Sequence, residues 1–131
     1  MSAVYETEPQ GLRDQPWFVN QVVRLAADPV IWSPEGVLST LQAVEAQMGR
    51  TRGEPDGPRV MDIDLLLFGD RVMQGGYLTL PHPRMRERAF VLVPLFEIAP
   101  DLVFPDGVAL RQALAQVRHR VEGNRIWQEQ T

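Results

Sequence analysis

The chain has 131 residues, of which 44% are hydrophobic, and this fits a single domain over residues 1–131 with an ordinary core. Cysteine is absent, which excludes disulfides and thiolate chemistry, and no apolar run is long enough to cross a bilayer. A net charge of −4 argues against a general nucleic-acid binder. The first residues lack the basic and apolar regions of a signal peptide, so a cytoplasmic protein without membrane or nucleic-acid partners is expected.

The first half of the chain contains two predicted strands and one predicted helix. Tyr5–Glu8 is predicted to end a strand, and Trp17–Ala26 alternates well enough to form another. Ser33-Pro34-Glu35 is a typical helix start, with a capping hydroxyl, a proline in the first turn and an acid at the positive end. The helix is predicted to run to about Met48 and to end at Gly49.

The second half begins with the strongest strand prediction, Val60–Phe68. Arg71–Met73 and Tyr77–Leu80 are predicted to form a hairpin around two glycines. Arg86–Ile98 is predicted to be helical, although a proline inside it should bend or shorten it. Leu110–Val117 is predicted to be a last helix. Because strands and helices are interleaved, the expected class is α+β with a mixed or antiparallel sheet.

Two acids stand out in the Val60–Phe68 strand. The period of a strand places Asp62 and Asp64 on one face, about 6–7 Å apart. Like charges on a buried strand repel each other and lose hydration, and a divalent cation such as Mg²⁺ relieves both costs. The alternative from spacing alone is a pair of acids at a strand end that pairs with nearby arginines.

Every basic residue of the chain is an arginine, so any phosphate contact must use guanidinium groups. Arginines precede and follow the two acids, and acids for metal flanked by arginines on loops are typical of phosphoryl transfer. The alternative for each arginine taken singly is a solvated surface charge. The cluster consists of Arg50, Arg52, Arg59, Arg84, Arg86 and Arg88.

Three further residues have both a functional and a structural interpretation. His82 lies between two prolines and is either structural or a contact to a phosphate. Phe18 and Asn20 share one strand face, which suits the stacking and hydrogen bonding of a flat heterocycle. The alternative for this pair is a core phenylalanine beside an asparagine at a strand end.

Three longer strings carry a resemblance to one family. They are Tyr5-Glu6-Thr7-Glu8-Pro9 followed by Gly11, Asp14-Gln15-Pro16, Phe18 and Asn20; Gly49-Arg50-x-Arg52 followed by Gly57-Pro58-Arg59-x-x-Asp62-Ile63-Asp64-Leu65-Leu66-Leu67-Phe68-Gly69; and Leu78-Thr79-Leu80-Pro81-His82-Pro83-Arg84-Met85-x-x-Arg88-x-Phe90-Val91-Leu92-x-Pro94-Leu95-x-Glu97-Ile98-Ala99-Pro100. In order and spacing they resemble the 6-hydroxymethyl-7,8-dihydropterin pyrophosphokinases, and the similarity spans residues 4 to about 115.

The resemblance implies a ferredoxin-like sheet with helices, and pyrophosphoryl transfer from ATP to the pterin alcohol in folate biosynthesis. It implies two Mg²⁺ ions held by Asp62 and Asp64, and Arg50 and Arg59 acting on the transferred group from a mobile loop. The implied ATP site contains Gln42, Glu45, Arg52, Leu65, Thr79, His82 and Arg88, and the implied pterin pocket contains Thr7, Phe18, Asn20 and Phe90, with the two phenylalanines sandwiching the ring.

The chain departs from the family pattern in three places. Asp56 stands where some members have a loop tryptophan, and Tyr77 where some have an arginine. The family's N-terminal strand and first helix find no counterpart before Val4, so the domain is expected to be N-terminally truncated. Two expectations follow. One is self-association through unpaired strand edges. The other, as the alternative function, is an inactive remnant that binds at most nucleotide or a partner chain. An RNA-binding module fits less well, because the chain is acidic and lacks the expected aromatic pair.

Overall fold

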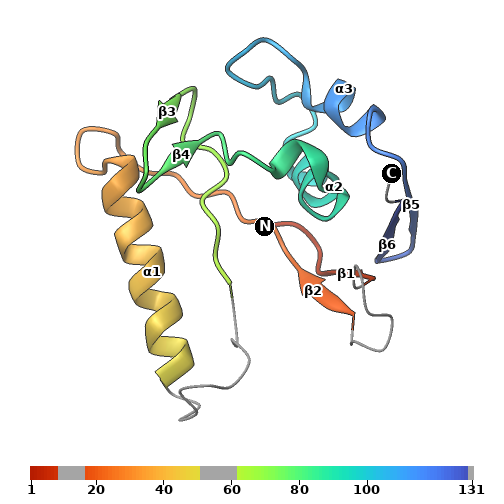
Figure 1. The fold of residues 1–131 in the computed structure, drawn as a ribbon, viewed down its shortest axis with the longest axis horizontal. Helices are drawn as coiled ribbons and strands as arrows, with labels where there is room; N and C mark the ends of the chain where they lie inside the picture. The colour runs from red at the N-terminus through yellow and green to blue at the C-terminus, as the bar shows by residue number, and fades with distance from the viewer. Residues whose placement is uncertain (9–16, 51–61, 130–131) are drawn as a thin grey trace. The chain divides into compact units, whose positions relative to one another are not determined.

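The computed structural model describes residues 1–8, 17–50 and 62–129 (Figure 1). Strands and helices alternate along these residues, and their sheet contains both parallel and antiparallel pairs, so the α+β class with a mixed sheet is confirmed. The elements are β1 (Tyr5–Thr7), β2 (Phe18–Asn20), α1 (Pro34–Arg50), β3 (Met73–Gln74), β4 (Thr79–Leu80), the 3₁₀ helix η1 (Met85–Glu87), α2 (Ala89–Ile98), α3 (Leu110–Ala115), β5 (His119–Glu122) and β6 (Arg125–Gln128). None of the helices in the described ranges has the length and apolar character needed to span a membrane.

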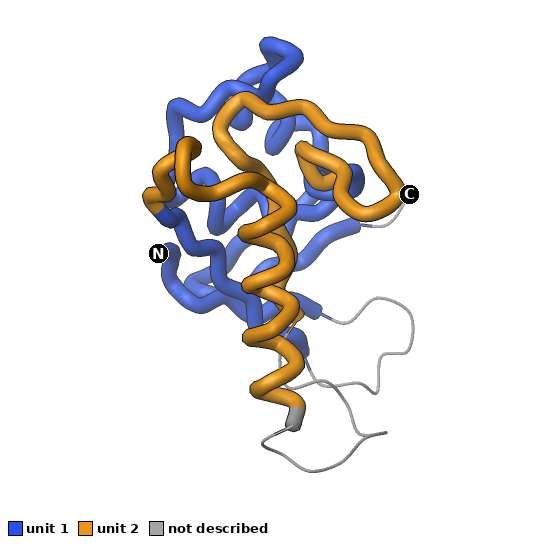
Figure 2. Tube along the Cα trace, turned by 90° about the vertical axis from the view of Figure 1, so that its left-hand side faces the viewer, with its two compact units in different colours: residues 1–25, 83–131 blue, residues 26–82 orange. Residues whose placement is uncertain are grey.

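The chain divides into two compact units (Figure 2). Unit 1 combines Met1–Leu25 with Pro83–Thr131, and unit 2 is the continuous stretch Ala26–His82. Unit 1 therefore contains β1, β2 and everything from η1 onward, whereas unit 2 contains α1 and the β3–β4 hairpin.

The four-stranded sheet of unit 1 has the strand order β2-β1-β6-β5. β1 is antiparallel to β2 and parallel to β6, and β5 is antiparallel to β6. Thr7 of β1 is thus paired with Phe18 on one side and with Ile126 on the other. The first and last strands of the described chain are neighbours, and this places Thr7 in the interior of the sheet.

The core of unit 1 lies between this sheet and α2. Nearly every residue of α2 is apolar, which is typical of a helix that is buried on most sides. Leu92 of α2, Leu110 of α3 and Ile126 of β6 are fully buried, and Phe104 is nearly so. This packing supports the inner strands β1 and β6, the first of which carries Thr7.

The predicted helix Arg86–Ile98 is wrong in its first turn. It divides at Arg88, whose backbone (φ −118°, ψ 108°) is extended, into η1 and α2. Pro94 lies inside α2 without ending it. The predicted helix Leu110–Val117 is confirmed as α3, which ends at Ala115.

The C-terminal hairpin β5–β6 was not expected from the sequence. Glu122 pairs with Arg125, so the loop between the strands consists of Gly123 and Asn124. Gly123 has φ 59°, a left-handed conformation that glycine adopts without strain. A two-residue loop with glycine first is a recognised hairpin connection, and the sequence carried this indication.

Unit 2 contains one confirmed helix start and one confirmed hairpin. The Ser33 hydroxyl accepts a hydrogen bond from the Gly36 N–H at 3.0 Å, which caps the α1 N-terminus as predicted. Met73 pairs with Leu80 and Gln74 with Thr79 in the predicted hairpin. The helix continues to Arg50, past the expected end at Gly49.

Two strand predictions are wrong over most of their length. Of Trp17–Ala26 only Phe18–Asn20 forms a strand. Of Val60–Phe68 the described part, Asp62–Phe68, has no strand assignment, and its apolar residues are half-buried. A strand is defined by pairing with a neighbour, which propensity and alternation do not supply.

Candidate functional site

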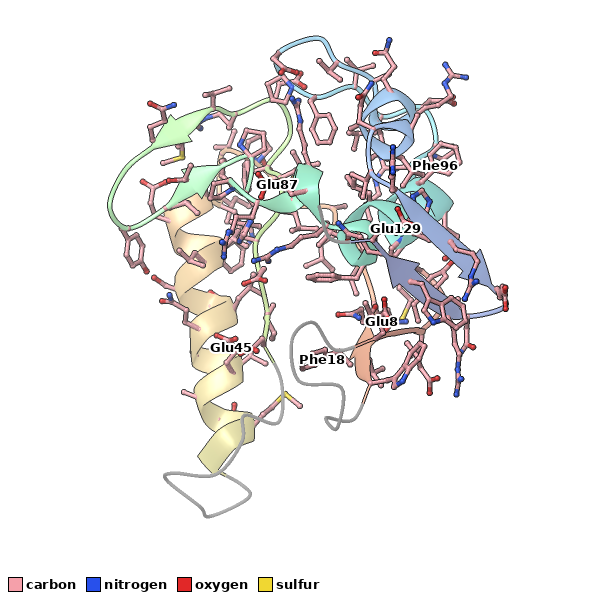
Figure 3. All side chains as sticks on the ribbon, turned by 45° about the vertical axis from the view of Figure 1, so that its right-hand side comes forward. Glu8, Phe18, Glu45, Glu87, Phe96 and Glu129 are labelled. Carbon is pink, nitrogen blue, oxygen red and sulfur yellow. The ribbon has the colours of Figure 1, made fainter. Side chains whose placement is uncertain are left out.

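The two predicted metal ligands lie in Asp62–Phe68, which we name the acidic segment. The side chains of Asp62 and Asp64 are exposed, and Ile63 between them is half-buried. The Glu45 carboxylate of α1 accepts a hydrogen bond from the Ile63 N–H at 2.7 Å. Figure 3 labels Glu45 on α1. A charge-assisted bond of this length fixes the backbone between the two aspartates to the helix.

A second contact joins the acidic segment to the residues that follow β4. The His82 N–H donates to the Leu66 carbonyl at 2.9 Å. His82 and Thr79 are both half-buried, and the Thr79 hydroxyl donates to the Gly75 carbonyl at 3.3 Å. The structure therefore brings together Glu45, the two aspartates, Leu65 and His82 within unit 2.

Gln42 of α1 is engaged by Tyr77, the residue that departs from the family pattern. The Tyr77 hydroxyl donates to Gln42 Oε1 at 3.3 Å, and it lies 3.0 Å from the Ser39 hydroxyl. Sequence reasoning named Gln42 but did not anticipate this contact. Tyr77 thus supports the helix face that carries two of the predicted ATP-site residues, Gln42 and Glu45.

The donor chemistry of the acidic segment fits Mg²⁺. Within the described residues, no group of three or more His, Cys, Asp or Glu side chains could hold a metal ion. Two exposed carboxylates two residues apart are nevertheless what Mg²⁺ commonly uses when substrate phosphates and water complete its shell. Asp62 and Asp64 are the residues that would hold it.

The predicted pterin residues of unit 1 lie on paired strands. Thr7 is buried with 4% of its surface exposed, and its hydroxyl accepts a hydrogen bond from Asn20 Nδ2 at 2.7 Å. Phe18, which Figure 3 labels, is the cross-strand partner of Thr7. Its side chain is 54% exposed. A buried hydroxyl, an oriented amide and an exposed ring therefore lie side by side.

Arg88 and Phe90 form a second group in unit 1, at the start of α2. The Arg88 guanidinium lies 5.5 Å from the centre of the Phe90 ring, a distance that permits a cation–π contact. Both side chains are half-buried. The predicted sandwich of a pterin between Phe18 and Phe90 stays a prediction.

Two polar clusters support these strands and helices. Glu97 of α2 accepts hydrogen bonds from the Ala3 N–H at 3.1 and 3.2 Å and from the Tyr5 hydroxyl at 2.8 Å. Burial, followed by the bond to Glu97 and its charge, raises the pKa of the Tyr5 phenol. These contacts connect β1 to α2, the two elements that carry Thr7 and Phe90.

The second supporting cluster holds the loop before α3 against η1. Arg86 donates two hydrogen bonds to Asp106, at 2.7 and 2.6 Å, and its guanidinium lies 4.0 Å from the centre of the Phe104 ring. The hydrogen bond from Arg86, followed by that from the Val108 N–H, lowers the pKa of Asp106 to about 2. Arg86 is therefore paired with Asp106, a partner that the alternative of a solvated surface charge did not predict.

Some predicted residues lie outside the described part of the chain. Arg52 and Arg59 fall in residues 51–61, as does Asp56. Arg50 ends α1, and its side chain lies outside the description as well. Their assigned roles stay predictions.

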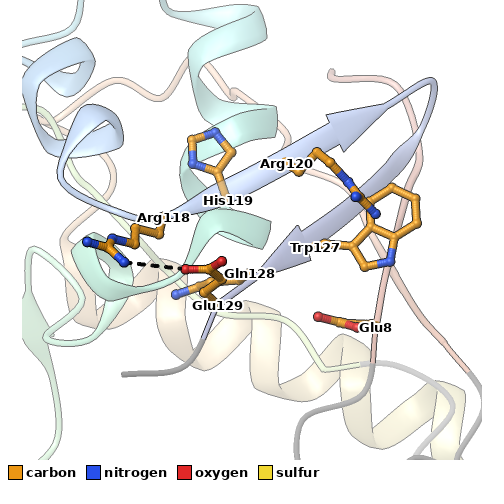
Figure 4. A pocket seen from close by; sticks show the side chains of 7 residues that line it. All are labelled: Glu8, Arg118, His119, Arg120, Trp127, Gln128 and Glu129. Carbon is orange, nitrogen blue, oxygen red and sulfur yellow. Dashed lines mark ion pairs between the residues drawn. The ribbon is translucent and has the colours of Figure 1, made fainter.

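An open pocket of about 650 Å³ lies on the C-terminal hairpin (Figure 4). Arg118–Arg120 of the β5 side, Trp127–Glu129 of the β6 side and Glu8 line it. Arg118 pairs with Glu129 at 3.7 Å across its rim, and both side chains are largely exposed. None of the predicted site residues lines this pocket.

Comparison with known proteins decides the family. The family described as 7,8-dihydro-6-hydroxymethylpterin-pyrophosphokinase (HPPK) matches residues 1–100. The chain belongs to this pyrophosphokinase family. The matched range contains every residue predicted for the site, whereas β5 and β6 follow it.

Three relatives carry the same name, 2-amino-4-hydroxy-6-hydroxymethyldihydropteridine pyrophosphokinase. The protein of Methylorubrum extorquens AM1 is 47% identical over 116 residues, which are 88% of this chain and 71% of the relative. That of Pseudomonas aeruginosa PAO1 is 44% identical over 115 residues, 88% of this chain and 69% of the relative. That of Bacillus subtilis 168 is 35% identical over 131 residues, 100% of this chain and 72% of the relative.

Proposed function

We propose that this chain transfers pyrophosphate from ATP to 6-hydroxymethyl-7,8-dihydropterin and releases AMP, as a step of folate biosynthesis. Membership of the pyrophosphokinase family carries the proposal. The pterin hydroxymethyl oxygen attacks the β-phosphorus of ATP, and the bond from that phosphorus to the oxygen bridging to the α-phosphorus breaks. The hydroxymethyl proton is lost, and AMP leaves with the bridging oxygen.

The residues of unit 2 take the nucleotide and the metal in this proposal. Glu45 holds the backbone between Asp62 and Asp64, so the two carboxylates keep a defined spacing. When bound, Mg²⁺ neutralises charge on the phosphate oxygens. The remaining nucleotide contacts are assigned to Gln42, Leu65, Thr79, His82 and Arg52, with Arg50 and Arg59 acting on the transferred group.

The residues of unit 1 take the pterin, together with one nucleotide contact at Arg88. Asn20 donates through Nδ2 to Thr7, which leaves Asn20 Oδ1 to accept from a donor on the heterocycle. Phe18, more than half exposed, offers a face for stacking. Phe90 supplies the second ring.

The proposal extends to location and assembly. We place the protein in the cytoplasm with small-molecule substrates, and without nucleic acid or membrane as a partner. Self-association is proposed from Leu65–Phe68, an apolar stretch that is half-buried and has no strand assignment. Light scattering across a concentration series tests it, and a single monomeric mass at all concentrations contradicts it.

One experiment tests the reaction and the metal together. A coupled AMP-release assay on the purified chain, with ATP, the pterin alcohol and Mg²⁺, is expected to show turnover that depends on all three. Calorimetry with a non-hydrolysable ATP analogue is expected to show tighter binding in Mg²⁺ than in EDTA. Asp62→Ala and Asp64→Ala are each expected to remove that difference.

The outcomes separate the reaction from the metal assignment. Turnover with unchanged nucleotide affinity in both aspartate variants contradicts the metal ligands and leaves the reaction in place. Nucleotide binding without turnover favours the second candidate, a nucleotide-binding protein without activity. The family match over residues 1–100 does not favour that candidate.

A further inference from the structure

One side chain of β6 is bonded to the junction between η1 and α2 in unit 1. Gln128 Oε1 accepts a hydrogen bond from the Ala89 N–H at 2.8 Å, and Gln128 Nε2 donates to the Glu87 carbonyl at 2.6 Å. These two backbone groups flank Arg88, and Figure 3 labels Glu87 at this place. A single amide therefore holds the main chain on both sides of Arg88.

The pairing of β6 within the sheet places the Gln128 side chain at this junction. Residues two apart on a strand share a face, and Ile126, two residues earlier in β6, is fully buried. β6 pairs with β1 through Ile126 and Thr7, and with β5 through Gln128 and His119. Because both neighbours fix the register of β6, the amide reaches the helix start from a paired strand.

The junction needs a hydrogen-bond acceptor that its own sequence does not supply. The first N–H groups of a helix have no partner within the helix, and Ser, Thr, Asp or Asn at the N-cap usually provides one. Arg88 occupies the N-cap of α2 and makes no side-chain cap bond. Ala89 is fully buried, so its N–H depends on Gln128.

We propose that Gln128 is a positioning residue that fixes Arg88 for nucleotide binding, an inference that rests on the proposed function of Arg88 as an ATP contact. With the cap supplied by β6, the N-cap position is available to an arginine. The rotamers open to Arg88 depend on its φ and ψ, so the bonds at Glu87 and Ala89 restrict the direction in which its side chain leaves the backbone. Gln128 lies outside residues 1–100 that match the family.

A double-mutant cycle on the full chain tests the inference by nucleotide affinity. Gln128→Met removes both hydrogen bonds at nearly constant side-chain length. It is expected to weaken binding of a non-hydrolysable ATP analogue in Mg²⁺ by about threefold to tenfold. In the Arg88→Ala background the same change is expected to have almost no further effect, because Gln128 acts through Arg88.

Gln116→Ala, which truncates an exposed amide of the same unit, is the matched control and is expected to leave affinity unchanged. Titrations are made well below the melting temperature of each variant. If Gln128→Met does not fold, Gln128→Glu, which keeps an acceptor for Ala89, replaces it in the cycle.

The inference is overturned if Gln128→Met lowers nucleotide affinity equally in the wild-type and Arg88→Ala backgrounds, because equal losses indicate a general structural role. An unchanged affinity in the single variant overturns it as well. If the expected coupling appears in a chain that releases no AMP, the proposed reaction fails and the positioning role stands. A wild-type chain that binds no nucleotide overturns both.

Discussion

The pterin-side residues of unit 1 and the acidic segment of unit 2 are held in different ways. Thr7 and Phe18 lie in strands whose backbones pair with their neighbours, so many hydrogen bonds share in placing them. The acidic segment has no strand assignment, and its contacts include the Glu45 carboxylate on the Ile63 N–H and backbone hydrogen bonds to the carbonyls of Leu66 and Phe68. Single side-chain changes should therefore disturb the position of the acidic segment far more than that of the strands.

The largest effect is expected for Asp64→Asn, which tests whether the acidic segment carries chemistry. Turnover should fall on the order of a hundredfold, because the charge that balances metal and phosphate is lost. The melting temperature should hardly change, since Asp64 is exposed. Asp70→Asn, an exposed aspartate of the same unit, is the control. Equal turnover in the two variants contradicts the assignment of Asp64.

Glu45→Ala tests the comparison directly. It removes the carboxylate that accepts from the Ile63 N–H, a charge-assisted bond worth about 2 kcal/mol. Hydrogen exchange at Ile63–Phe68 should become faster and nucleotide affinity weaker, whereas exchange in β1 and β2 should stay as in the wild type. Glu45→Gln keeps a hydrogen-bond acceptor, so its exchange rate and nucleotide affinity should lie between those of the wild type and those of Glu45→Ala. Unchanged exchange in Ile63–Phe68 would show that other contacts hold the segment.

Arg59→Ala separates rate from affinity. Arg59 is expected to stabilise charge on the transferred group, so turnover should fall by at least about tenfold, or about 1.4 kcal/mol of barrier, with KM little changed. Steady-state kinetics of AMP release measures both constants. A raised KM with unchanged turnover would move Arg59 to plain substrate binding.

Thr7→Val tests the pterin-side residues of unit 1, which lie in paired strands. The buried hydroxyl that accepts from Asn20 is lost at nearly constant shape, which should cost about 1 kcal/mol of unfolding free energy, or about 4 °C in melting temperature. KM for the pterin should rise because the Asn20 amide loses its orienting partner. A rise in KM for ATP instead would contradict the assignment of this pair to the pterin.

The smallest effect concerns acid stability in unit 1. Arg86 lowers the pKa of Asp106 to about 2 from the ordinary 3.8, so the pair stabilises the folded chain fully above that ordinary value. This contribution is lost as the pH falls from about 3.8 towards 2. Asp106→Asn should lower the melting temperature slightly at pH 6 and should show less further loss than the wild type below pH 4. If the melting temperatures of the wild type and of Asp106→Asn change with pH in parallel, the Arg86–Asp106 pair makes no measurable contribution to stability.

Local sequence patterns predicted the elements that depend on local chemistry. The Ser33 cap, the β3–β4 hairpin and the apolar helices followed from capping residues, glycines and periodicity. The Val60–Phe68 strand was wrong over its described part because an apolar run does not show whether a partner strand is present. The β5–β6 hairpin was missed although Gly123-Asn124 marks its loop.

The candidate site was predicted as a set of residues and not as a set of contacts. Spacing and family resemblance named Glu45, Asp62 and Asp64, but the bond from Ile63 to Glu45 joins residues 18 apart and depends on how α1 meets the acidic segment. Tyr77 was noticed as a departure, and its bond to Gln42 became visible only in the structure. Gln128 escaped notice because its partners are backbone groups, 39 and 41 residues away.

The pairing of β1 with β6 also sets an order of events during synthesis. Glu6 and Arg125, which form an ion pair across these strands, are 119 residues apart, so the interior of the sheet closes only after β6 has been synthesised and has left the ribosome. Unit 2 is continuous from Ala26 to His82 and needs none of the later residues for its own contacts. At a ribosomal rate of about 5–20 residues per second, β6 follows β1 by about 6 to 24 seconds. During this interval the edge of β1 is open to chaperones or to neighbouring nascent chains.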